Sequence, residues 1–260
     1  MISFTSEQWY QWIAAFLWPL FRFLGLFMAD PFFRMRQFPR TVKVGLAFLT
    51  TVLIAPTLPP MPAIPPASYM GLFILLEQVL IGIMLAVTIR IVFAAIEMAG
   101  NLIGTQMGLG FAMFYDPQNA AQVPLLAQLT GMFAMLMFIS LNGHLLMINL
   151  LAESFQILPI STQSLAAEGW QNLAHWGKAI FSLGLILSLP MMTALLVTNL
   201  VVGVMSRAAP QMNIFGIGFA INLGVGVGLF YLALPYLRPA MEASFDTYLG
   251  YARQLLTVMR

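Results

Sequence analysis

Four ionisable side chains lie inside or at the ends of long apolar stretches, where charge is costly. They are Arg22, Glu77, Arg90 and Glu97. A charge at the centre of a bilayer costs about 2.5–3.5 kcal/mol even on gentle insertion scales, so such residues usually face a partner, a cavity or water. Helical spacing puts Arg90 and Glu97 on one face of a helix. The four residues could line a polar path, relay protons or pair between subunits, but a buried ion pair or a side chain that snorkels from a helix end is the simpler interpretation.

Other kinds of site chemistry have little support in the sequence. The two histidines, His144 and His175, lie in different segments without the spacing of metal ligands. The absence of cysteine excludes thiolate nucleophiles, thiolate metal sites and disulfides. We find no phosphate-binding loop, zinc-protease motif or nucleophile elbow. With 11 basic and 9 acidic residues, the chain also lacks the basic excess of a nucleic-acid-binding protein. We therefore expect no enzymatic activity, no cofactor, no metal ion and no nucleic-acid partner.

A glycine series precedes a bulky apolar tip near the middle of the chain. Gly100, Gly104 and Gly108 form two overlapping GxxxG patterns, which let another helix approach closely; ordinary tight helix packing gives the same pattern. The next residues include Gly110, which can leave helical geometry, and Asp116 before Pro117, which disfavours helix. The tip between these breakers carries Phe111, Met113, Phe114 and Tyr115. Such a tip could fill a hole and act as a plug.

A second glycine series lies in the last hydrophobic stretch. The series comprises Gly216, Gly218, Gly224, Gly226 and Gly228, and we expect it to permit close packing with other helices. Asn199, Gln211, Asn213 and Asn222 could form hydrogen bonds across such a contact.

The elements that carry these residues are predicted to be membrane helices. The chain is 60% hydrophobic and 8% charged, whereas soluble domains carry about 25% charged residues. A helix needs about 20 apolar residues to span the hydrocarbon core. Continuous apolar runs, without the alternation of barrel strands, favour helices. The stretches that reach or approach this length are Trp9–Met28, Val44–Leu58, Tyr69–Ile96, Leu125–Leu151, Ala179–Ser206 and Ile214–Leu237. We predict an all-α, integral-membrane chain with one domain over residues 1–260, ending in an amphipathic helix at 240–260.

The distribution of charge gives an incomplete prediction of topology. The basic cluster at residues 30–43 is expected in the cytoplasm, and residues 153–170, which lack basic side chains, are expected outside. Six simple spans would then put the C-terminal tail outside. That tail carries Arg238, Arg253 and Arg260, which conflicts with the positive-inside rule.

Several motifs resemble the FliR family of bacterial export-gate proteins. They occur in family-like order along nearly the whole chain, although residues 161–177 and the C-terminal tail match least. The matching residues are Thr5–Trp9, Gln106–Leu109 with Phe111 and Asp116–Pro117, Leu141–His144, Leu158–Ile160, Arg207–Gln211 and Asn213–Phe215.

The resemblance implies a subunit of the flagellar type III protein export gate. Proteins of this family assemble with FliP and FliQ in the bacterial inner membrane, at the centre of the flagellar basal body, and unfolded flagellar polypeptides pass through the assembly. FlhA and FlhB are the expected partners on the cytoplasmic side, rod components are the expected distal partners, and membrane lipid surrounds the gate. Reversed helical hairpins, which are typical of the family, would remove the topology conflict.

The resemblance also implies that a loop at residues 106–122 projects into the pore and helps to close it. The predicted plug residues are Gln106, Met107, Gly108, Leu109, Gly110, Phe111, Met113, Phe114, Tyr115, Asp116 and Pro117. The expected mechanism is passive gating, in which apolar side chains exclude water and ions until a polypeptide displaces the loop. The alternative is a secondary transporter of a small solute that uses Glu77, Arg90 and Glu97 as its coupling or substrate site.

Overall fold

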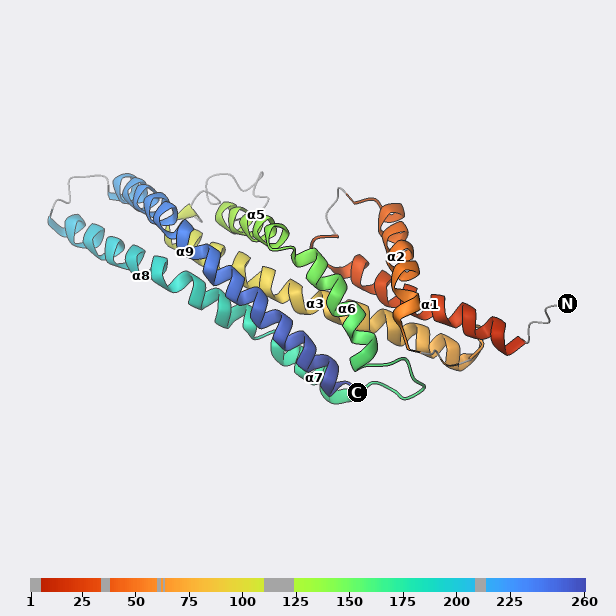
Figure 1. The fold of residues 1–260 in the computed structure, drawn as a ribbon. Coiled ribbons are helices and arrows are strands. Elements are labelled where there is room, and N and C mark those ends of the chain that lie inside the picture. Colours follow the sequence, from red (N-terminus) through yellow and green to blue (C-terminus); the bar gives the residue numbers. More distant parts are fainter. Residues whose placement is uncertain (1–5, 34–37, 60–61, 63, 110–123, 209–213) are drawn as a thin grey trace, which may run out of the picture. The chain divides into compact units, whose positions relative to one another are not determined.

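The described part of the chain is built from helices. The computed structural model describes residues 6–33, 38–59, 62, 64–109, 124–208 and 214–260 (Figure 1), and all their regular secondary structure is helical. This confirms the all-α prediction. The elements are α1 (Ser6–Ala29), α2 (Arg40–Ile54), η1 (Ala55–Thr57), α3 (Tyr69–Gln106), α5 (Leu125–Ser140), α6 (Gly143–Ile157), α7 (Ala167–Trp176), α8 (Ala179–Ala208) and α9 (Ile214–Val258).

Most of these helices are suited to a membrane. Among the described residues, five helical segments are long and apolar enough to cross a bilayer, and a sixth results if α5 and α6 count as one bent span. The five segments are Trp9–Ala29, Arg40–Thr57, Tyr69–Gln106, Ala167–Ala208 and Gly218–Val258. The prediction of an integral-membrane helical chain is therefore confirmed.

Three of the differences from the predicted helix boundaries are informative. First, α3 continues for 38 residues through Gly100 and Gly104. Glycine weakens a helix by about 1 kcal/mol, which close packing can offset. Second, the apolar run after Leu125 is bent by 65° between α5 and α6, where Asn142 adopts a left-handed conformation with φ 55°. Third, α9 contains the region that we expected to be a separate C-terminal helix, and it continues past Pro235 and Pro239.

The chain forms two compact units, and α3 and α9 contribute to both. The first unit comprises Met1–Arg90, Asn142–Gly177 and Asp246–Arg260. Within it α2 packs against α1 (Figure 1), and the rings of Phe16 and Phe48 meet edge to face at 5.1 Å.

The second unit comprises Ile91–Leu141 and Lys178–Phe245. The rings of Phe93, Phe138 and Phe245 lie 5.5–5.8 Å apart and join α3, α5 and α9. Helices α8 and α9 lie side by side (Figure 1), and the Asn222 side-chain amide donates a hydrogen bond to the Asn199 side-chain oxygen. Two of the four polar residues expected to form hydrogen bonds across a helix contact thus meet, whereas Gln211 and Asn213 lie outside the described residues.

Candidate functional site

Some of the predicted plug residues lie in the described part of the chain, and the others lie outside it. Gln106 ends α3, and Met107, Gly108 and Leu109 follow it in the described chain. The remaining predicted plug residues lie outside the described residues; they are Gly110, Phe111, Met113, Phe114, Tyr115, Asp116 and Pro117. The structure therefore describes the two segments that flank residues 110–123. We call these segments, the end of α3 up to Leu109 and the start of α5, the stem of the loop.

Close packing of α3 on α5 forms one side of this stem. A β-carbon at Gly100 would lie 2.7 Å from the backbone oxygen of Leu126 and 2.8 Å from the α-carbon of Ala127. A β-carbon at Gly104 would lie 3.3 Å from that of Leu126. The Thr130 hydroxyl donates a hydrogen bond to the Ile96 carbonyl at 3.3 Å. Gly100 and Gly104 of the first glycine series thus face α5 of the same chain.

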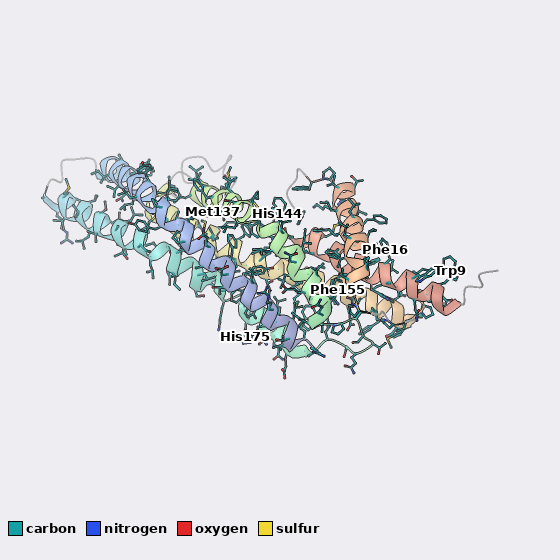
Figure 2. All side chains as sticks on the ribbon, in the orientation of Figure 1. Trp9, Phe16, Met137, His144, Phe155 and His175 are labelled. Carbon is teal, nitrogen blue, oxygen red and sulfur yellow. The ribbon has the colours of Figure 1, made fainter. Side chains whose placement is uncertain are left out.

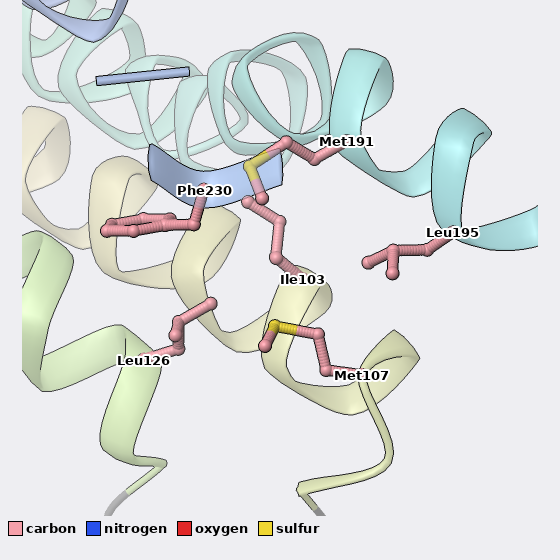
Figure 3. Close-up of a cluster of buried hydrophobic side chains, with 6 residues drawn as sticks. All are labelled: Ile103, Met107, Leu126, Met191, Leu195 and Phe230. Carbon is pink, nitrogen blue, oxygen red and sulfur yellow. The ribbon is translucent and has the colours of Figure 1, made fainter. Parts of the chain in front are cut away.

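A buried apolar cluster holds both ends of the stem together (Figure 3). Met107, which directly follows α3, is 1% exposed and lies in one cluster with Leu126, near the start of α5. The other members come from α3, α8 and α9 and are Ile103, Met191, Leu195 and Phe230. Gly108 has φ 82°, a conformation that favours glycine, and turns the chain away from the helix after Met107. Residues 110–123 are thus connected to two helices that are packed against each other.

The glycines of the second series differ in what surrounds them. A β-carbon at Gly226 would lie 2.5 Å from Cγ of Met107, so this glycine faces the stem. Gly224 and Gly228 are exposed, and a β-carbon at either would meet nothing within 4 Å in the described chain.

Arg22 is fully buried in the first unit and is held by three acceptors. Its Nε donates to the Gln78 side chain at 2.8 Å, Nη1 to the Ser154 hydroxyl at 2.9 Å, and Nη2 to the Leu158 carbonyl at 3.2 Å. The ring of Phe155 on α6 (Figure 2) lies 4.1 Å from the guanidinium carbon, a distance suited to a cation–π interaction. The sequence did not identify these acceptors, although Gln78 and Ser154 are polar residues within apolar stretches.

Glu77 lies in the same unit and is 6% exposed. Its Oε1 accepts a hydrogen bond from the backbone N–H of Leu165 at 3.2 Å. Arg22 and Glu77 attract each other, but they form no direct ion pair among the described residues.

The other two predicted intramembrane charges are exposed. Arg90 and Glu97 both lie on α3. The Glu97 side chain contacts Gly131 of α5, where an added β-carbon would lie 3.1 Å from Cγ and Oε1 of the glutamate. The structure therefore separates the four predicted charges into two buried and two exposed residues.

Asp30 is a buried ionisable group that the sequence analysis did not select. Its Oδ1 accepts backbone hydrogen bonds from Phe32 at 2.8 Å and Phe33 at 3.1 Å, whereas Oδ2 is buried without a partner among the described residues. Burial raises the pKa of Asp30 to about 6, and the two backbone hydrogen bonds oppose this rise.

The histidines give no indication of a metal site. The ring of His144 stacks on that of Phe32 at 5.7 Å, and Nδ1 of His175 lies 2.8 Å from the Gln171 carbonyl oxygen. No group of three potential metal ligands occurs in the described part of the chain.

Comparison with known proteins assigns the chain to a family. Residues 13–248 match the family model described as bacterial export proteins, family 1. The flagellar biosynthetic protein FliR of Escherichia coli K12 is 42% identical over 246 residues, which cover 95% of this chain and 94% of that protein. FliR of Pectobacterium carotovorum is 41% identical over 257 residues, which cover 99% and 98%. FliR of Bacillus subtilis is 26% identical over 249 residues, which cover 94% and 95%. The chain therefore belongs to the FliR family of bacterial export proteins.

Proposed function

We propose that this chain forms, with FliP and FliQ, the channel through which unfolded flagellar proteins cross the bacterial inner membrane. Membership of the FliR family makes it a component of the flagellar export apparatus. In this proposal residues 1–260 act as one export-gate domain in the flagellar basal body. FlhA and FlhB bind on the cytoplasmic side, and rod components bind distally.

The anchored stem carries the proposal that residues 106–122 close the channel. Met107 and Leu126 lie in one buried cluster, so the two segments from which the loop starts and to which it returns are held together. Apolar side chains at a constriction exclude water and ions without a tight seal. An entering polypeptide would displace the tip and leave the packing of α3 on α5 intact.

Exposed apolar helix faces support assembly with other membrane proteins. Large side chains on α8 are more than half exposed, including Phe181 and Leu200, and these suit lipid or a neighbouring helix. The exposed Gly224 and Gly228 on α9 suit the closer approach of a partner helix, because small residues let helix backbones come together.

Deletion of residues 110–116 tests the plug. Cells that express the full set of gate proteins with this deletion should leak ions, measured as membrane conductance or potassium efflux. The control is the complex with the parent loop, expressed at the same level. Normal conductance of the loop deletion, in a complex that still assembles, would overturn the plug.

Purification from membranes tests the subunit role and separates it from solute transport. The chain should co-purify with FliP and FliQ, and the mass of the intact complex gives its composition. A chain that is stable alone and catalyses solute uptake in liposomes would contradict the proposal and favour a secondary transporter.

A further inference from the structure

The first turn of α2 carries backbone donors that find no acceptor in the described chain. Its N-cap residue, Pro39, provides no side-chain hydrogen bond, and the turn contains no acidic residue. The N–H groups of Val42 and Lys43 donate to the Pro39 carbonyl at 3.1 and 3.3 Å. Those of Arg40 and Thr41 have no acceptor among the described residues. Two unsatisfied N–H groups at the positive end of a helix dipole attract an anion.

Lys43 adds a largely buried cation to the same turn. It is 8% exposed, and no described residue forms a hydrogen bond or ion pair with its side chain. The ammonium nitrogen is not one of the fully buried unpaired atoms of the described chain, so it reaches the surface. Helical side chains lean toward the helix N-terminus, which directs the Lys43 stem toward the unsatisfied N–H groups. A cation that has lost part of its water without gaining a counterion is stabilised by an anion beside it.

An exposed apolar face continues directly from this turn along α2. Val44, Phe48 and Val52 recur every four residues, so they lie on one side of the helix, and they are 45–50% exposed. Leu49 and Leu53 beside them are 57% and 74% exposed. Donors for an anion at the start of a helix and apolar side chains along it match the head and the acyl chains of a phospholipid. A free phosphate ion would leave the apolar face uncovered.

We propose that the first turn of α2 binds the phosphodiester of an anionic phospholipid, whose acyl chains cover the exposed face from Val44 to Leu53. Lys43 lies on the buried side of the helix and Val44 on the exposed side, so the headgroup sits over the end of the helix, where the two sides meet. The exposed Arg40 provides a second positive charge there. Both cations repel the amine of a zwitterionic headgroup, so the lipid carries a net negative charge. The basic cluster at residues 30–43 is expected on the cytoplasmic side, where anionic lipids attract basic side chains.

Photo-crosslinking of the purified full-length chain in detergent tests the inference. The probe is phosphatidylglycerol with a diazirine in one acyl chain, and peptide mass spectrometry quantifies its attachment to residues 44–53. Unlabelled phosphatidylglycerol should reduce this attachment at least about fivefold more than an equal amount of phosphatidylcholine, the factor expected from one cation near a membrane surface. Equal competition by both lipids would show binding through the acyl chains alone and overturn the inference. Inorganic phosphate that competes as well as phosphatidylglycerol would point to a free anion and overturn it as well.

Variants of Lys43 separate the headgroup contact from folding. Lys43→Met keeps an unbranched, apolar stem but removes the charge, so attachment to residues 44–53 should fall at least about fivefold while helix content is unchanged. Lys43→Arg retains the charge and should keep most of the attachment. Arg207→Gln removes an exposed charge from the end of α8 and should be labelled on α2 as the parent is. Undiminished labelling of a folded Lys43→Met variant would refute the role of Lys43.

Arg40→Gln tests the same contact without disturbing a buried residue. Arg40 is exposed, so its replacement should leave the packing of α2 intact even if Lys43→Met does not fold. Attachment to residues 44–53 should fall at least about twofold, less than for Lys43→Met because solvent screens an exposed charge. Unchanged attachment in Arg40→Gln would contradict recognition of an anionic headgroup at this turn.

Labelling in native membrane vesicles distinguishes lipid from protein on this face. When the probe is introduced into the vesicles, residues 44–53 should be labelled as they are in detergent. A protein helix that covers the face would abolish labelling in the vesicles while the isolated chain is still labelled, and this result would overturn the inference. These readouts do not depend on export, so they can fail while the proposed function holds.

Discussion

The side chain of Met107 fills the space that a β-carbon on Gly226 would need. Such a carbon would lie 2.5 Å from Cγ and 2.8 Å from Sδ of the methionine, closer than real side chains approach. Met107 comes directly before Gly108, which has a left-handed conformation. Because Gly226 on α9 has no side chain, it leaves room for Met107 and so helps to fix the position at which α3 ends. Gly228, on the same helix, meets nothing within 4 Å and provides a matched control.

Gly226→Val should destabilise the loop stem. The added branched side chain must displace Met107 from its cluster, and overpacking of this kind costs about 1–3 kcal/mol. Thermal unfolding in detergent, followed by helical circular dichroism, measures the change. Gly228→Val should leave the stability of the isolated chain close to that of the parent. Equal stability of the two variants would show that Met107 moves aside at little cost.

Gly100→Ala should be more damaging than its small size suggests. The new methyl group would lie 2.7 Å from the Leu126 carbonyl oxygen and 2.8 Å from Cα of Ala127, and backbone atoms cannot rotate away. We expect a loss of about 2 kcal/mol or more, which exceeds the helix-propensity gain of about 1 kcal/mol. Gly104→Ala, where the nearest atom lies at 3.3 Å, is the comparison. The packing argument fails if both variants unfold at the same temperature.

Gly228→Leu should separate folding from assembly. No described atom lies near this position, so the isolated chain should retain its stability. Under the proposal that this face packs on a partner helix, recovery of the complex with FliP and FliQ should fall several-fold, because a bulky residue prevents close helix approach. Gly250→Leu, at another open position on α9, should assemble normally. Normal recovery of the Gly228→Leu complex would place the partner elsewhere.

Arg22→Lys should destabilise the first unit although it conserves charge. Lysine cannot reproduce the planar fork that donates to Gln78, Ser154 and Leu158, so at least one buried acceptor loses its partner, at about 1–3 kcal/mol. Denaturant titration in detergent gives the difference. Arg90→Lys changes an exposed arginine and should alter the stability by less than about 0.5 kcal/mol. If lysine is tolerated equally at both positions, the fork geometry is unimportant.

Apolar length alone predicted some helices well. The stretch Ala179–Ser206 became α8, which ends at Ala208, because the apolar run has membrane length and the helix continues past Pro190. The continuation of α3 through Gly100 was not predictable, since its glycines stay helical only where α5 packs against them. The bend before α6 depends on the left-handed Asn142, a conformation that one sequence does not reveal.

The surroundings of the candidate sites were less predictable than their members. Arg22 was identified because a charged side chain in an apolar stretch is energetically costly. Its acceptors Gln78 and Ser154, however, lie 56 and 132 positions away along the chain. Only the folded chain brings them together. Likewise, the second glycine series could not show that Gly226 faces Met107 whereas Gly224 and Gly228 meet no described atom within 4 Å.

Asp30 should make the stability of the chain depend on pH. Burial raises its pKa to about 6, against an ordinary value of about 3.9, so the folded chain binds this proton more tightly than the unfolded chain does. Protonation of Asp30 therefore stabilises the fold; the contribution is complete below about pH 4 and disappears as the pH rises through about 6. Its size should be on the order of 2–3 kcal/mol.

Asp30→Asn separates this contribution from those of the other titrating groups. Asparagine keeps an oxygen for the backbone N–H groups of Phe32 and Phe33 but cannot ionise. Unfolding in detergent from pH 4 to pH 7 should show the parent chain losing stability relative to the variant, with most of the change between pH 5 and pH 7. Parallel stability curves would mean that Oδ2 finds a donor or water when ionised, because burial of the carboxylate away from water is the cause of its raised pKa.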